Sequence, residues 1–327
     1  MEIFIYMSMS VFVYIMILCL LIADSQTVIS GASYGLMLWY KNVVPILLPF
    51  MLISSLVVER IASGKSRRAA LFSTIFLGVL CGYPIGARVT DEYVTSGMYE
   101  KETGNIILPL CNNSSPMFIS GYIVSRILKN QISFFTAMLI IYIPYIFVTL
   151  ICLLISTSKI NRSKTGKYKK DKYKTGKSPK NKYEKTNLNK EKPKETSSDT
   201  KTNSRNTRKT NDAMLNSIIQ ITYVGIYIMI CSIIMQFILK INFIPYDLKI
   251  YLSSAVEITR GTDMVYKYLL ISEKTKTALL LALTSFGGVS AILQTNKVIA
   301  NSRLSIIRYI FMKVLCAAMS FFGALII

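Results

Sequence analysis

Four short polar motifs interrupt long apolar stretches of this chain, and their residue types could bind a small polar molecule. In chain order they are residues 82–88 (GYPIGAR), 112–116 (NNSSP), 255–261 (AVEITRG) and 287–290 (GGVS). Glycine and proline break helices and free backbone groups, while asparagine, serine and glutamate add hydrogen-bonding side chains. Freed backbone groups at membrane depth are tolerated only against protein or water, so we expect these motifs to surround a polar pocket.

The motifs form two pairs with one common spacing. Asn112 follows Gly82 at the same distance along the chain at which Gly287 follows Glu257. A single shift therefore places Gly82 on Glu257 and Asn112 on Gly287, although few residues are identical at that shift. Broken hydrophobic segments at matching positions in two halves are typical of transporters that bind a solute near the membrane midplane.

Two interpretations are open for the first pair of motifs. Gly82, Pro84 and Gly86 could form a plain helix end with a turn, or an unwound segment whose backbone groups face a ligand. Residues 112–116 lie inside the uncharged run 103–125, where polar side chains are costly in lipid. They could join neighbouring helices by hydrogen bonds, or they could face a cavity.

The second pair carries a charged candidate. Glu257 and Arg260 are three residues apart on a moderately apolar stretch, so they could form an ion pair with each other. An acid within a membrane is otherwise a candidate contact for a ligand or a coupling ion. Residues 285–290, with Gln294 behind them, match the 112–116 motif, and two facing hairpins of this kind would form a midplane pocket.

We expect Asn112, Asn113, Glu257 and Ser290 to line one cavity, because each would cost on the order of 1–3 kcal/mol if it faced lipid. Asn112→Leu and Glu257→Leu are therefore predicted to insert normally and to lose function. The candidate solute-binding residues are Gly82, Tyr83, Pro84, Gly86, Arg88, Asn112, Asn113, Ser114, Glu257, Thr259, Gly261, Gly287, Gly288, Ser290 and Gln294.

The elements that must position these residues are membrane helices. The chain has 327 residues, of which 52% are hydrophobic. Its long apolar runs are residues 3–22, 42–58, 69–87, 103–125, 130–158, 213–239 and 277–296. Most are long enough to cross a hydrocarbon core, which takes about 20 helical residues. The first run lacks a positively charged start and a clear cleavage site, so we interpret it as a retained transmembrane helix.

The net charge of +21 comes mostly from one segment. Residues 159–210 contain 19 Lys and Arg against 5 Asp and Glu, which gives +14, and almost no aliphatic residues. Such a segment cannot form a core, so we expect a disordered loop. The simplest interpretation is a solvated cytoplasmic linker. A more specific interpretation is a segment that contacts anionic lipid headgroups. Nucleic acid is the weakest alternative, and we expect no such partner.

Other residue types exclude several chemistries. The chain has no histidine, which removes a zinc site built on histidine and any Ser–His or Cys–His catalytic pair. Its six cysteines all lie in apolar segments without a Cys-x-x-Cys spacing, so we interpret them as buried small hydrophobic residues. We therefore expect no enzymatic activity, no metal and no cofactor.

Charge also predicts the topology. The basic loop and the cluster of residues 65–68 belong in the cytoplasm by the positive-inside rule. Three apolar stretches lie between these two cytoplasmic markers, where an even number of crossings is needed, so residues 103–125 should be re-entrant or broken. The second half then starts on the opposite side from the first. We expect a cytoplasmic N-terminus and an extracytoplasmic C-terminus.

The predicted fold is an all-α polytopic membrane protein with an inverted-topology repeat and broken or re-entrant helices. Residues 1–40 would hold an N-terminal transmembrane helix and an outer loop, and residues 41–158 the first repeat. Residues 159–212 would form the basic cytoplasmic loop, and residues 213–327 the second repeat. The oligomeric state is left open.

The motifs resemble those of the YlbJ sporulation integral membrane protein family, within the larger group that carries the nucleoside recognition (Gate) domain. The resemblance rests on residues 82–88, 112–119, 257–261 and 286–290 with Gln294, and it covers roughly residues 40–327. The family usually has a histidine between the last glycine motif and the glutamine, whereas residues 291–293 here are Ala, Ile and Leu. The connector between residues 59 and 69 is also shorter than usual.

The resemblance implies a protein of the mother-cell or forespore membranes that is needed for spore cortex formation, with a fold related to Gate-domain transporters. We therefore expect a transporter- or permease-like protein that moves or senses a small polar solute. The alternative is a non-transporting scaffold that recruits partners through the basic loop. Deletion of residues 159–210 discriminates, because only the scaffold should fail without them.

Overall fold

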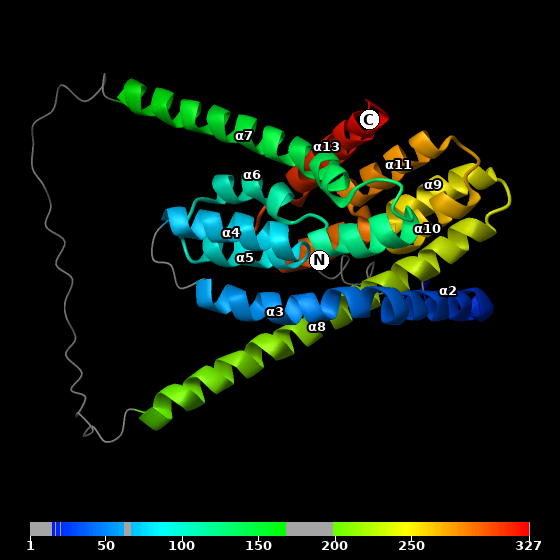
Figure 1. The fold of residues 1–327 in the computed structure, drawn as a ribbon, viewed down its shortest axis with the longest axis horizontal. Coiled ribbons are helices and arrows are strands. Elements are labelled where there is room, and N and C mark those ends of the chain that lie inside the picture. The colour runs from blue at the N-terminus through cyan, green and yellow to red at the C-terminus, as the bar shows by residue number, and fades with distance from the viewer. Residues whose placement is uncertain (1–14, 17, 20, 62–66, 168–198, 327) are drawn as a thin grey trace, which may run out of the picture.

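The computed structural model describes residues 15–16, 18–19, 21–61, 67–167 and 199–326, and these ranges contain helices and no strand. The helices, in chain order, are α2 (Ser25–Leu38), η1 (Trp39–Val43), α3 (Val44–Ile61), α4 (Arg67–Cys81), α5 (Ile85–Thr95), α6 (Lys101–Cys111), η2 (Phe118–Ile127), α7 (Phe134–Lys167), α8 (Asp199–Lys240), α9 (Tyr246–Val256), α10 (Ile258–Tyr268), α11 (Glu273–Phe286), α12 (Gly288–Val298) and α13 (Ile306–Ile326) (Figure 1).

Five stretches of the described chain are long and apolar enough to cross a membrane. They are Ser25–Ile53, Phe134–Ser156, Ser217–Lys240, Glu273–Val298 and Ile306–Ile326. Large apolar side chains on their outer surfaces are exposed, such as Phe147 on α7 and Phe311 on α13. Such a surface is suited to lipid rather than to water. The chain is therefore an all-α, multi-pass membrane protein.

Each of the four polar motifs coincides with a break between two helices. The breaks separate α4 from α5, α6 from η2, α9 from α10, and α11 from α12. The helix ends before them repeat the spacing seen in the sequence. Cys81 and Val256 end α4 and α9, Cys111 and Phe286 end α6 and α11, and the shift that places Gly82 on Glu257 relates both pairs.

The N-terminal part of the chain differs from the expected outer loop before residue 41. Helix α2 occupies Ser25–Leu38 and continues through η1 into α3. No proline or charged residue interrupts α2, and Asp24 caps its start by accepting a hydrogen bond from the backbone N–H of Thr27. Helix α2 packs along α8 (Figure 1). Most of the apolar run at residues 3–22 lies outside the described residues.

The expected basic loop is also partly helical. Helix α7 extends to Lys167 and α8 starts at Asp199, so residues 159–167 and 199–212 continue the two membrane helices. The sequence there contains no proline, and lysine and arginine favour helix, which lets each helix run on past its apolar part. The disorder predicted for the rest falls on residues 168–198, which lie outside the described residues.

The main hydrophobic core positions the breaks. It contains buried side chains from η2, α7, α10, α11 and α13, among them Ile123, Ile141, Val265 and Leu281. Helix α11 packs along α13 within it. This core therefore holds the breaks that follow α6, α9 and α11 close to one another, although they are far apart in sequence.

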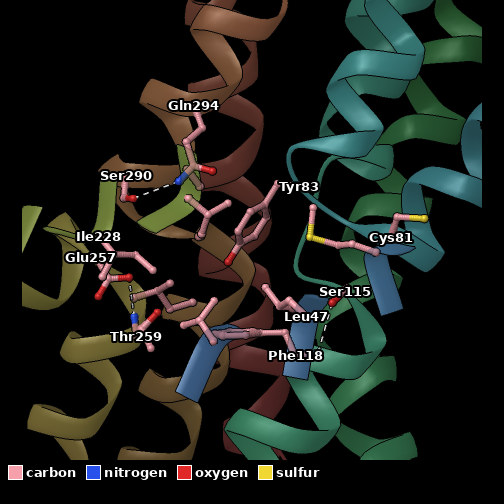
Figure 2. A pocket seen from close by; sticks show the side chains of 16 residues that line it. Leu47, Cys81, Tyr83, Ser115, Phe118, Ile228, Glu257, Thr259, Ser290 and Gln294 are labelled. Carbon is pink, nitrogen blue, oxygen red and sulfur yellow. Dashed lines mark hydrogen bonds between the residues drawn. The ribbon is translucent and has the colours of Figure 1, made fainter. Parts of the chain in front are cut away.

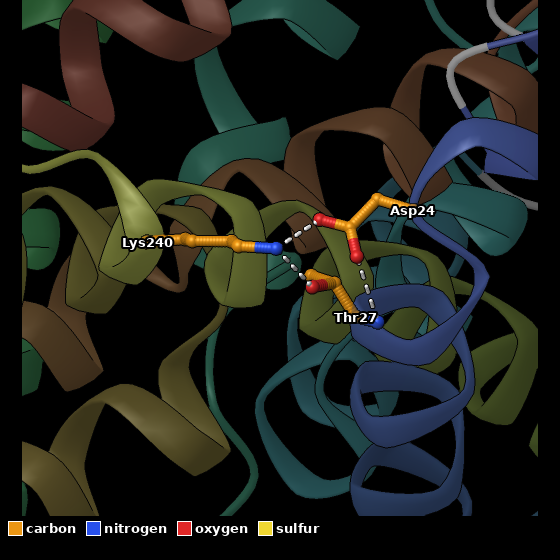
Figure 3. A network of polar contacts seen from close by, with 3 residues as sticks. All are labelled: Asp24, Thr27 and Lys240. Atoms are coloured by element: carbon orange, nitrogen blue, oxygen red, sulfur yellow. Dashed lines mark hydrogen bonds and ion pairs between the residues drawn. The ribbon is translucent and has the colours of Figure 1, made fainter.

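One ion pair joins the outer ends of α2 and α8 (Figure 3). The ammonium of Lys240 donates hydrogen bonds to the carboxylate of Asp24 and to the hydroxyl of Thr27. The hydrogen bond from Lys240 holds the pKa of Asp24 below its usual value. Because the Lys240 side chain is 61% exposed, water and salt screen this pair, and its contribution to stability is small.

Asp24→Asn is expected to lower the heat-unfolding midpoint slightly at neutral pH, because the pair with Lys240 is lost. Since the folded pKa of Asp24 is depressed, the pair stabilises at pH values above the unfolded pKa and is lost as pH falls through the folded pKa. The difference between wild type and variant should therefore vanish in acid and at high salt. Heat unfolding at several pH values measures it, and a difference that grows in acid would contradict the assignment.

Candidate functional site

A small buried cavity lies between the helix breaks of the two motif pairs (Figure 2). Its volume is about 30 Å³, room for roughly two water molecules. Apolar side chains from α3, η2 and α8 form much of its wall. Its polar lining comes from both halves of the chain and consists of Tyr83, Ser115, Glu257, Thr259, Ser290 and Gln294.

Glu257 occupies the break between α9 and α10 and is 1% exposed. Its carboxylate caps α10 by accepting backbone hydrogen bonds from Thr259 at 2.9 Å and Arg260 at 2.7 Å. The Arg260 side chain turns elsewhere and donates to the carbonyl of Ser232 and to the side chain of Gln236. Glu257 and Arg260 therefore do not form the ion pair that the sequence allowed. Glu257 lines the cavity instead.

Gln294 lines the same cavity and carries a buried polar atom without a partner among the described residues. Its side-chain N–H donates to the hydroxyl of Ser290 at 3.2 Å, one helical turn earlier on α12. Its amide oxygen is buried without a hydrogen-bond partner among the described residues. Figure 2 shows this oxygen on the side away from Ser290, and Tyr83 reaching from the opposite side toward Glu257 and Thr259. Buried polar atoms are nearly always satisfied, so this oxygen indicates a missing partner.

Asn112 is fully buried, but it does not line the cavity as we expected. Its side-chain amide donates to the hydroxyls of Thr295 at 2.7 Å and Tyr309 at 3.0 Å, and its side-chain oxygen accepts from the backbone N–H of Ala87. These bonds join the break after α6 to α5, α12 and α13. Asn112 therefore joins neighbouring helices by hydrogen bonds, which is one of the two interpretations that the sequence left open.

Asn113 also lies off the cavity lining and instead contacts a lysine that the sequence analysis missed. Lys313 of α13 is 0% exposed, and its ammonium donates to the side-chain oxygen of Asn113 at 3.1 Å and to the carbonyl of Ser285 at 2.9 Å. It lies 5.0 Å from the ring centre of Tyr145. The signal was present in the sequence, because Lys313 is a charge in the middle of an apolar segment.

Ser114 joins the first broken pair to the second. Its hydroxyl donates to the carbonyl of Thr284 near the end of α11, and its own carbonyl accepts from the hydroxyl of Tyr142 on α7. Like Asn112 and Asn113, it is fully buried away from the cavity lining. The first polar cluster thus holds the helices around the site, while the second supplies most of the polar cavity wall.

The remaining candidates divide by exposure. Arg88 is exposed on α5, outside the cavity lining. The others are buried at the breaks without lining the cavity, namely Gly82, Pro84, Gly86, Gly261 and Gly288. Of the fifteen predicted residues, the structure thus brings six together around the cavity, namely Tyr83, Glu257, Thr259, Gly287, Ser290 and Gln294.

Gly86 is needed for close packing rather than for ligand contact. A Cβ atom at this position would lie 2.0 Å from the carbonyl oxygen of Cys111, which is backbone and cannot turn away. Gly287 differs, because its φ of 86° is a left-handed conformation that ends α11 and starts α12. The glycines of the motifs therefore let broken helices approach one another.

Gly86→Ala is expected to destabilise the protein by about 1–3 kcal/mol, the usual range for overpacking a core, because the Cys111 backbone must shift. Gly323→Ala on α13 is the matched control, since nothing lies within 4 Å of its added Cβ and alanine favours helix. Heat unfolding in detergent compares the two. Equal midpoints for both variants would show that the contact between α5 and the break after α6 is loose.

Comparison of the chain with family models, curated proteins and solved structures finds no match. The cavity volume of about 30 Å³ is also well below the roughly 300–1,000 Å³ of pockets that enclose drug-sized ligands. In this conformation the site accommodates water or a small ion, and a larger solute requires the helices to separate.

Proposed function

We propose that this protein is transporter- or permease-like and moves or senses a small polar solute. One observation carries the proposal. Glu257, Gln294 and Tyr83 line one cavity where helix breaks from both halves of a membrane protein meet, and the Gln294 amide oxygen has no hydrogen-bond partner among the described residues. Polar groups enclosed among broken membrane helices mark solute sites in transporters.

The small cavity fits a closed conformation of such a protein. We propose that the two halves form an inverted-topology repeat whose broken or re-entrant helices open the cavity to each side of the membrane in turn. The matching spacing of helix ends in the two halves supports this proposal. Rocking of one repeat against the other around a fixed central site is a common way to provide alternating access.

We also propose that the protein acts in the mother-cell or forespore membranes during sporulation and is needed for spore cortex formation. The resemblance of the four motifs to the YlbJ family supports this setting, and all four motifs lie at helix breaks. The same resemblance gives no solute, so the solute is described only by the chemistry of the cavity.

Cavity-filling variants test the proposal. Ser290→Leu should abolish cortex formation in spores that carry the variant at normal membrane levels, because its side chain fills the cavity. Ser125→Leu, at an exposed position of η2, is the control and should leave spores normal. Normal spores with Ser290→Leu would overturn the proposal.

Loop deletion separates transport from the scaffold alternative. Because the end of α7 and the start of α8 lie far apart, residues 168–198 are deleted and replaced by an uncharged Gly–Ser linker of equal length, which leaves both helices intact (Figure 1). A transporter should tolerate this deletion, because α7 does not line the cavity and the α8 residues that do, Val224 and Ile228, lie far along the helix from its start at Asp199. A scaffold that recruits partners through the basic segment should instead lose function with the deletion and keep it with Ser290→Leu.

A further inference from the structure

The break between α9 and α10 combines oxygen acceptors in a way that the solute proposal alone does not explain. Each carboxylate oxygen of Glu257 accepts one backbone hydrogen bond and retains further acceptor capacity. The side chain of Gln294 lines the same cavity and is 5% exposed, and its amide oxygen is buried without a partner among the described residues. Two independent acceptors thus belong to side chains that line one small cavity.

Backbone carbonyls add to this cluster. Gly288 lies directly against the end of α9, where an added Cβ would be 3.2 Å from the carbonyl oxygen of Val256 and 3.4 Å from that of Ala255. The last carbonyls of a helix carry partial negative charge and lack partners within the helix. The end of α9 therefore places acceptors against Gly288, which directly follows the cavity residue Gly287.

The positive charges of this region are engaged elsewhere. Among the described residues, none of the ion pairs includes Glu257. Arg260 directs its guanidinium to Ser232 and Gln236, and Lys313 directs its ammonium to Asn113 and Ser285 at the end of α11. In the described part of the chain, the end of α11 thus has a cation hydrogen-bonded to it, whereas the Glu257 carboxylate at the end of α9 accepts hydrogen bonds from backbone N–H groups of α10.

We propose that the cavity binds one small monovalent cation, such as Na⁺, between the Glu257 carboxylate and the Gln294 amide oxygen. The inference rests on the proposed function, in which this ion is the coupling ion. Ser290 is a positioning residue, because its hydroxyl accepts a hydrogen bond from the Gln294 N–H and so orients the amide whose oxygen has no partner among the described residues. Unwound carbonyls and helix C-terminal ends bind coupling ions in transporters built from broken helices.

Charge and volume select this class of ion. Divalent cations such as Ca²⁺ and transition metals favour several charged or His and Cys ligands, and no group of three His, Cys, Asp or Glu occurs in the described part of the chain. One carboxylate matches one positive charge. A cavity of about 30 Å³ holds a small ion with roughly one water, whereas choline is too large.

The sole tryptophan provides the readout. Trp39 lies in η1, four residues before the cavity residue Val43, and its indole N–H donates to the carbonyl of Ile221 on α8 at 3.0 Å. Helix α8 also lines the cavity through Val224. An ion that draws the α9–α10 break and α12 together should shift α8 and change the fluorescence of Trp39.

The experiment titrates the full chain in lipid nanodiscs with NaCl against choline chloride at constant ionic strength. We expect a saturable change in Trp39 fluorescence with Na⁺, and parallel titrations with LiCl, KCl and NH₄Cl identify the preferred ion. Glu257→Gln and Gln294→Leu should each weaken apparent binding by about 10-fold or more, which corresponds to about 1.4 kcal/mol. Gln294→Leu keeps the Glu257 cap of α10 and so serves if Glu257→Gln fails to fold.

Glu273→Gln is the matched control, because this exposed acid pairs with Lys276 at the outer end of α11 and should leave binding unchanged. No response to any of the four cations, or an equal response in Gln294→Leu, would overturn the cation site. If the cation site is overturned but Ser290→Leu still abolishes cortex formation, the proposed function remains without the cation site. If the cation binds but Ser290→Leu leaves spores normal, the cation site stands and the proposed function fails.

Discussion

Lys313→Met is expected to leave the protein as stable as wild type or more stable, and to abolish its function. Lys313 is fully buried and has no carboxylate partner among the described ion pairs. Burial of an unpaired charge costs several kcal/mol, whereas methionine has similar volume and no charge. A gain of about 1 kcal/mol would raise the heat-unfolding midpoint of a chain of this length by roughly 1–2 °C.

The two acceptors of Lys313 explain why its loss should be tolerated. The side-chain oxygen of Asn113 still accepts from the backbone N–H of Ser114, and the carbonyl of Ser285 still accepts from the hydroxyl of Tyr145. Neither acceptor is left unsatisfied by Lys313→Met. A charge that costs stability within a membrane indicates function, and Lys313 lies beside the cavity residue Gly287.

Lys313→Ala is the comparison, because it removes the charge and also leaves a cavity. It should destabilise by about 2–5 kcal/mol relative to Lys313→Met. Heat unfolding of both variants and spore assays of Lys313→Met test the prediction. A Lys313→Met protein that unfolds more easily than wild type would mean that the ammonium stabilises the fold, and the functional assignment would then lose its basis.

Asn112→Leu is expected to destabilise the protein by roughly 3–5 kcal/mol, which is at the upper end for one substitution. It removes both bonds to Thr295 and Tyr309 and leaves the buried N–H of Ala87 without its side-chain acceptor. The branched leucine also has to fit among the packed atoms around a position that is 0% exposed. The result would be an inserted but loosely packed protein.

Asn301→Leu is the matched control for Asn112→Leu. Asn301 is exposed, and its amide makes one long hydrogen bond of 3.4 Å to Asp91. Its substitution should change stability by less than about 0.5 kcal/mol, as surface substitutions usually do. Heat unfolding in detergent compares the two leucine variants. A stable Asn112→Leu protein that still loses function would contradict this structural role and would indicate that Asn112 contributes to the solute site.

The positions of two helix breaks could be predicted from the sequence because their cause is local. Pro84 lacks an N–H donor, and Gly287 adopts a left-handed φ, so each break follows from the residue at that place. The spacing between Gly82 and Asn112 likewise needs no tertiary information. Local chemistry therefore explains the breaks after α4 and α11, whereas the break at Glu257 has no glycine or proline between α9 and α10.

The partners of the polar side chains could not be predicted, because they depend on packing between distant helices. Asn112 and Glu257 have the same sequence signature, a polar residue within an apolar run, yet one joins helices and the other lines the cavity. The difference arises from α12 and α13, which place Thr295 and Tyr309 beside Asn112. A sequence pattern identifies costly polar residues but not what satisfies them.

Cysteine labelling at Ser290 tests most directly whether the buried cavity opens to water within a membrane. In a chain whose six native cysteines are replaced by alanine, Ser290→Cys in lipid vesicles should react with a hydrophilic thiol reagent, although Ser290 is 3% exposed. Phe147→Cys, at 55% exposure in the middle of α7, should face lipid and remain unreactive. A folded protein in which Ser290→Cys stays unreactive would contradict the account.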